Sequence, residues 1–115
     1  MFLRIALAAQ TVALLLQAVT AGLLLSSPGG RTAHSATAIA VAVTVLLHLV
    51  AALLTRQRGL ILSAVAMLVM TLAQMALGIA HMKALHVPLG VLMFGASLLR
   101  FSRAWPAGRA TTASA

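Results

Sequence analysis

The sequence predicts an all-α fold, a transmembrane four-helix bundle with up-down-up-down topology, and three observations carry this prediction. The chain of 115 residues is 63% hydrophobic, has a mean hydropathy of +1.12 and contains no Asp or Glu. A soluble domain needs a charged surface, so this composition excludes one. The apolar residues form four runs close to the roughly 20 residues with which a helix crosses a bilayer. Short polar segments separate the runs, which makes consecutive helices antiparallel neighbours.

The four expected helices fill most of the chain. Their approximate limits are Leu3 to Leu25, Ser35 to Leu54, Leu60 to Ala80 and Leu85 to Phe101. The segments between them are SSPGG, TRQRG and HMKA, which hold residues typical of turns. The first run exceeds the roughly 7 to 15 residues of a signal-peptide core, so a membrane helix is preferred to a cleaved leader. We expect one domain over 1–105 and a disordered cytoplasmic tail over 106–115.

The basic residues indicate how the bundle is oriented. The formal charge of +8 is spread over segment ends without a polar face, so nucleic acid is not an expected partner. One side of the predicted bundle holds Arg4, Arg56, Arg58, Arg100, Arg103 and Arg109, and the other side holds Arg31 and Lys83. The positive-inside rule then places both termini in the cytoplasm. The chain has no cysteine, which excludes a thiolate haem ligand and covalent haem attachment.

The two predicted hairpins share a pattern that suggests a twofold repeat. A glutamine precedes a glycine in each, as Gln17 and Gln74, and a histidine follows near the start of the next helix, as His34 and His86. A basic residue stands three positions before each histidine, and a small residue stands four positions after it. Both hairpins cross the membrane in the same direction, so their symmetry axis would lie along the membrane normal.

Paired histidines on facing helices predict a haem site. Iron in a b-type haem takes two axial ligands on opposite faces of the ring, and His34 and His86 would supply neutral imidazoles. Ala38 and Gly90 would leave room for the flat ring against the backbone. Arg31 and Lys83 lie outward of the histidines, where cations would meet the haem propionates. Solvated histidines at helix ends are the alternative, since they need no ligand.

Two further histidines have other interpretations. His48 follows His34 by fourteen residues, which returns it to nearly the same helix face and roughly 21 Å deeper. A second haem there is not favoured, because the matching position on the fourth helix is Arg100. A neutral His48 that is hydrogen-bonded to Gln10 or Thr44, or that lies near the lipid headgroups, is the simpler expectation, although Met67 lies at a suitable depth for a ligand. His81 is an alternative ligand to His86.

These features resemble one four-helix half of haem A synthase. The resemblance covers roughly Gln10 to Phe101 and rests on Gln17 to Gly22, His34, Gln74 to Gly78, and the histidine in Ala84-Leu85-His86-Val87-Pro88. It implies that His34 and His86 are the axial pair of a b-type haem near the outer face. The Arg that commonly follows the first of these histidines is Ser35 here, and the family's acidic catalytic residue has no counterpart. The resemblance therefore implies the bundle and the haem pocket and not synthase activity.

The sequence thus predicts a b-type haem-binding protein of a bacterial plasma membrane, active in electron transfer or haem handling. A chain this short has little room for a separate substrate site, so a redox partner or a homodimer is expected. The alternative is a cofactor-free structural subunit of a larger membrane complex. A drug transporter is disfavoured, because the chain has no carboxylate to couple protons to cationic substrates.

Overall fold

The computed structural model describes residues 1–105 and confirms the predicted all-α, up-down-up-down bundle. Its four helices are α1 (Phe2–Ser26), α2 (Gly30–Thr55), α3 (Arg58–Ile79) and α4 (Lys83–Ala104). Each is long and apolar enough to cross a membrane. The four helices and the turns between them fill 2–104, and the tail expected over 106–115 lies outside the described residues.

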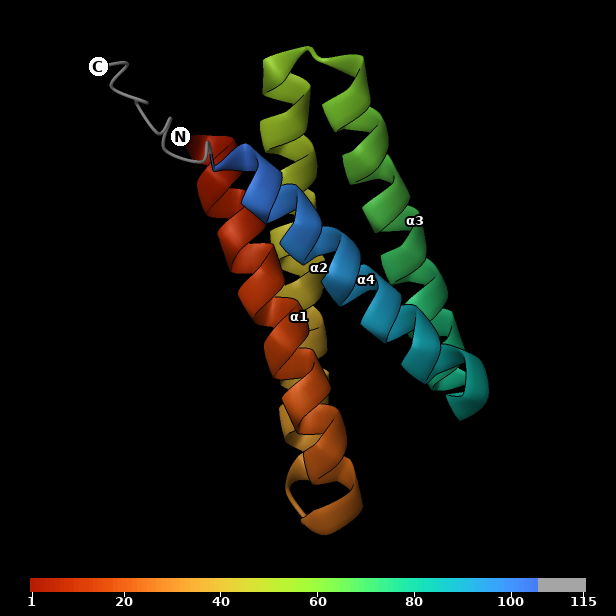
Figure 1. Cartoon of the computed structure of the whole chain (residues 1–115). Helices are drawn as coiled ribbons and strands as arrows, with labels where there is room; N and C mark the ends of the chain where they lie inside the picture. Colours follow the sequence, from red (N-terminus) through yellow and green to blue (C-terminus); the bar gives the residue numbers. More distant parts are fainter. Residues whose placement is uncertain (106–115) are drawn as a thin grey trace, which may run out of the picture.

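The helices form a ring in which each one packs against two others. α1 contacts α2 and α4, and α3 contacts α2 and α4, whereas the diagonal pairs do not touch through their backbones. In Figure 1, α1 and α2 run side by side, and α4 crosses obliquely from the end of α3 to the beginning of α1. Consequently α3 and α4 are close at the turn between them and diverge towards the α2–α3 turn.

Two helices begin earlier than hydropathy predicted. α2 begins at Gly30 and not near Ser35, and α4 begins at Lys83 and not near Leu85. Hydropathy identifies the part of a helix that lies in the lipid core, whereas the backbone hydrogen bonds of the helix continue into the polar interface. Because of this extension, His34 and His86 lie inside the first two turns of their helices, and Arg31 and Lys83 are helical as well.

The apolar core of the bundle is small. The buried cluster consists of Ala13, Leu14, Val41, Val45, Met67 and Met93. Most large apolar side chains point outwards instead, and Ile39 and Val91 are each 67% exposed. A bilayer requires helices that are apolar on their outer face as well as their inner face, because lipid and not water surrounds the outer face.

The α1–α2 turn depends on a close backbone approach at Gly30. A Cβ atom added there would collide with the carbonyl group of Leu23, far inside van der Waals contact. The same position at Gly29 meets nothing within 4 Å. Gly30 therefore allows α2 to start directly against the last turn of α1, and this fixes the height of His34 one turn later.

Candidate functional site

The two predicted ligands lie together at one end of the bundle. The ring centroids of His34 on α2 and His86 on α4 are 6.2 Å apart, with an angle of 65° between the ring planes. Their helices do not pack against each other directly. The imidazoles therefore meet across the space between α2 and α4, as the up-down-up-down topology predicts.

His34 is held by polar side chains of α1. Its Nε2 lies 3.2 Å from the amide nitrogen of Gln17, and its Nδ1 lies 3.2 Å from the Thr20 hydroxyl. An amide NH₂ only donates, so Nε2 carries the lone pair and Nδ1 carries the proton. The Thr37 hydroxyl donates to Oε1 of the Gln17 side chain, which holds the Gln17 amide group in place.

His86 is held by the backbone of α3. Its Nδ1–H donates to the Gln74 carbonyl oxygen at 3.0 Å, and the Gln74 side-chain amide donates to the His86 carbonyl oxygen at 2.7 Å. The Nε2 atom of His86 is thereby left with its lone pair. This is the tautomer of a histidine prepared to bind a metal, because a donor bond at Nδ1 sets the ring orientation and raises the basicity of Nε2.

The same residue pair recurs in the two hairpins. Gln17 bonds His34 between α1 and α2, and Gln74 bonds His86 between α3 and α4. The contacts differ in detail, since the first joins two side chains and the second joins side chains to backbone. Each glutamine thus positions the histidine of its own hairpin.

The remaining predicted residues lie within about one helical turn of His34 or His86 along the chain. Ala38 and Gly90 are half-buried, and Arg31 and Lys83 are exposed. A Cβ atom at Gly90 would lie 2.9 Å from the Gln74 amide nitrogen, so Gly90 makes room for that amide. The neighbouring Gln74 Oε1 is buried without a hydrogen-bond partner among the described residues. Buried acceptors without a hydrogen-bond partner are rare in folded proteins, so this hairpin contains an unusual unsatisfied polar atom.

His81 differs from the other three histidines in its backbone conformation. It is exposed in the α3–α4 turn and has a φ of 57°, a left-handed conformation. Its backbone therefore serves the turn, whose short length brings α4 back along α3. Its role as an alternative ligand remains a prediction.

His48 belongs to a second polar cluster, which is buried between helices. Its Nδ1 donates to Gln10 Oε1 at 2.9 Å, as predicted, and the Gln10 amide donates to the Ser97 hydroxyl at 2.8 Å. The Thr11 and Ser97 hydroxyls are also 2.8 Å apart. All four side chains are buried and come from α1, α2 and α4. Thr44, the other partner considered, bonds only carbonyls of its own helix.

Four hydroxyl residues in these clusters were not predicted from the sequence: Thr11, Thr20, Thr37 and Ser97. Each one is a polar residue inside an apolar run, and that position was the available signal, because such residues face protein partners and not lipid. Their partners depend on how each helix is rotated about its axis, which the apolar pattern leaves open.

Cys, Asp and Glu are absent from the whole sequence, so His and Met are the side chains that remain to ligate a haem iron. Within residues 1–105, no three histidines gather into a metal-binding group. A bis-histidine haem needs only two. Comparison with protein-family models, with curated proteins and with solved structures gives no match to this chain.

Proposed function

We propose that this chain binds one b-type haem with His34 and His86 as axial ligands, and that it acts in electron transfer or haem handling. The observation that carries the proposal is the separation of the two rings. A metal–imidazole bond of about 2 Å on each side of one iron atom separates the ring centroids by about 6 Å, once the half-width of each ring is added. The rings of His34 and His86 are 6.2 Å apart.

The nitrogen atoms of the two histidines support the same chemistry. His86 presents an unprotonated Nε2, and its Nδ1–H is bonded to the Gln74 carbonyl. His34 also has its lone pair on Nε2, but the Gln17 amide occupies it. Ligation by His34 requires Gln17 to give up this contact, at a cost of about 1 kcal/mol for a neutral hydrogen bond. An iron–nitrogen bond is far stronger, so this cost does not oppose the proposal.

The surroundings fit the anionic edge of a haem. Arg31 and Lys83 are exposed and lie one helical turn outward of the histidines. The chain holds no side-chain carboxylate that would compete for them. These two cations would hold the propionates, and Ala38 and Gly90 are small residues near the ligands. A haem bound there would supply one-electron redox chemistry.

Charge supports an orientation for the protein. Among the described residues, the end of the bundle with the α2–α3 turn holds Arg4, Arg56, Arg58, Arg100 and Arg103, and the end with His34 and His86 holds Arg31 and Lys83. The positive-inside rule then places both termini in the cytoplasm and the haem near the outer face. The resemblance to haem A synthase extends this proposal to a bacterial plasma membrane and to a redox partner or a second copy of the chain.

The proposal is tested by the absorption spectrum of the purified protein. Reduced protein should give the sharp bands of a low-spin haem, and His34→Ala or His86→Ala should each abolish them. His48→Ala is the control, because it removes a histidine of α2 that bonds Gln10 and not His86, and it should leave the low-spin spectrum intact. Low-spin spectra that persist in both alanine variants would overturn the assignment.

A cofactor-free structural subunit is the second candidate. It is favoured by one observation, that both ring nitrogens of His34 already have hydrogen-bond partners. In that case the purified protein is colourless after expression with ample haem, and His34→Ala lowers stability without a spectral change.

A further inference from the structure

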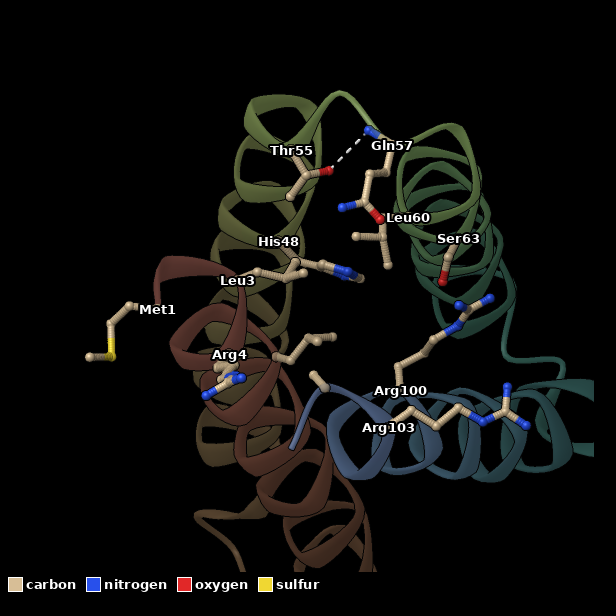
Figure 2. A pocket seen from close by; sticks show the side chains of 12 residues that line it. Met1, Leu3, Arg4, His48, Thr55, Gln57, Leu60, Ser63, Arg100 and Arg103 are labelled. Carbon is tan, nitrogen blue, oxygen red and sulfur yellow. Dashed lines mark hydrogen bonds between the residues drawn. The ribbon is translucent and has the colours of Figure 1, made fainter. Parts of the chain in front are cut away.

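A cavity opens between the helices at the end opposite to His34 and His86. It has a volume of about 380 Å³ and is lined by residues of all four helices, including His48, Ser63, Arg100 and Arg103. Figure 2 shows it between the α2–α3 hairpin and the end of α4. It lies where α3 and α4 diverge, so the cavity follows from the oblique course of α4.

Two guanidinium groups of α4 line this cavity without an internal counter-ion. Arg100 and Arg103 are three residues apart and therefore neighbours on the helix surface, where like charges destabilise each other. Arg100 is half-buried, and Figure 2 shows its side chain extending from α4 towards Ser63 on α3. The chain contains no Asp or Glu that could compensate them. An anion bound from outside would remove this repulsion and form charge-assisted hydrogen bonds.

His48 contributes a second, independent polar group. Its side chain is only 3% exposed, and its Nδ1–H donates to Gln10 Oε1. The other ring nitrogen, Nε2, has no partner among the described residues. Figure 2 shows the ring projecting from α2 into the cavity. In the neutral ring Nε2 is an acceptor, so the complementary ligand group is a hydroxyl donor.

We propose that this cavity binds an anion that combines a phosphate group with a hydroxyl, carried either on the phosphorus itself or on the attached headgroup. Arg100 and Arg103 bind its anionic oxygens, and its hydroxyl donates to His48 Nε2. Hydrogen phosphate satisfies this chemistry, and so does the headgroup of an anionic phospholipid such as phosphatidylglycerol. Basic clefts between membrane helices are suited to such headgroups. The site is separate from His34 and His86 and does not depend on haem binding.

Thermal unfolding of the full chain in a neutral detergent tests the ligand chemistry. A ligand of the folded state raises the unfolding temperature with its concentration, which gives an apparent Kd. At constant ionic strength, phosphate should bind about tenfold more tightly than sulfate, which has the same shape and no hydroxyl. Equal affinity for the two anions overturns the role of His48. Short-chain phosphatidylglycerol, with phosphatidylcholine as its control, distinguishes the sources: tighter binding than phosphate identifies a lipid headgroup, and equal or weaker binding identifies the free anion.

Paired variants test the position of the site. Arg100→Gln with Arg103→Gln should weaken binding of the preferred ligand about tenfold or more, because charge-assisted hydrogen bonds are lost. Arg56→Gln with Arg58→Gln removes the same charge at the same end of the bundle, and neither residue lines this cavity. This control should change the affinity by less than about threefold. If both double variants lose the same affinity for the ligand, the effect comes from general surface charge and the proposal is overturned.

Discussion

His34 and His48 lie on the same helix and each is hydrogen-bonded to a glutamine of α1, yet their surroundings differ. His34 is half-buried near an end of the bundle, faces His86 and accepts its bond from Gln17 at Nε2. His48 is fully buried and donates to Gln10 through Nδ1. The first histidine therefore needs only to exchange one weak partner in order to bind a metal. The second is part of a polar layer that joins three helices.

This polar layer predicts a stability effect. Gln10→Leu leaves the His48 Nδ1–H and the Ser97 hydroxyl without the amide that joins them. We expect the free energy of unfolding in detergent to fall by roughly 0.6 to 2 kcal/mol, the usual range for such bonds in membranes. Thr44→Val is the control, since the Thr44 hydroxyl bonds only its own helix. Unchanged stability in Gln10→Leu would mean that lipid or water replaces the amide.

Charge near the proposed haem predicts a change of reduction potential. Arg31→Gln with Lys83→Gln removes positive charge close to the iron, which favours the ferric state and lowers the potential. Haem retention should weaken, and the low-spin spectrum should persist because His34 and His86 are unchanged. Arg58→Gln, at the opposite end, should leave the potential unchanged in the same redox titration. If the double variant keeps the wild-type reduction potential, Arg31 and Lys83 only mark the membrane interface and do not pair with the haem propionates.

At the scale of the elements, each hairpin positions one histidine by a short turn. The α1–α2 turn brings Gly30 against the last turn of α1, and the α3–α4 turn uses the left-handed conformation of His81. In both hairpins the glutamine of the outgoing helix then meets the histidine of the returning helix. Turn geometry thus determines the height of each ring.

Gly30→Ala should therefore destabilise the first hairpin. The added methyl group would collide with the backbone of Leu23, which cannot move without shifting α1. Overpacking of this kind typically costs about 1 to 3 kcal/mol. Gly29→Ala is the matched control, because its Cβ meets nothing within 4 Å. Chemical or thermal unfolding in detergent measures the difference, and equal stabilities of the two variants would contradict the close approach of Gly30 to Leu23.

At the scale of the whole molecule, basic residues are concentrated at one end of a bundle whose helices are otherwise apolar on every side. Among the described residues that end holds Arg4, Arg56, Arg58, Arg100 and Arg103, against Arg31 and Lys83 at the other end. The positive-inside rule applied to this division predicts that both termini lie in the cytoplasm.

This orientation is tested with reporters fused to the C-terminus. A fluorescent protein that folds only in the cytoplasm should be active, and an alkaline phosphatase that requires export should be inactive. The same fusions after the α1–α2 turn should give the opposite pattern. An active phosphatase at the C-terminus would invert the bundle and move the proposed haem to the cytoplasmic face.

The sequence by itself determined the class, the number of helices and the antiparallel order. Each of these properties follows from the average character of many residues. About 20 apolar residues make a helix long enough to cross a membrane. Short polar segments between such helices force neighbours to be antiparallel. It also predicted that His34 and His86 share one end, and that His48 bonds Gln10 or Thr44, of which the structure shows Gln10. Helix starts at Gly30 and Lys83 were missed because hydropathy reports lipid contact and not backbone hydrogen bonding.

Only the tertiary structure decided which side chains meet. Helices that are apolar on all faces carry little periodic information about their rotation, so the partners Thr11, Thr20, Thr37 and Ser97 could not be assigned from the pattern. The separation of 6.2 Å between the His34 and His86 rings depends on the packing of four helices at once. The cavity beside His48 and Arg100 exists because α4 crosses the bundle obliquely. Crossing angles arise from side-chain packing between helices, which no local segment of the chain encodes.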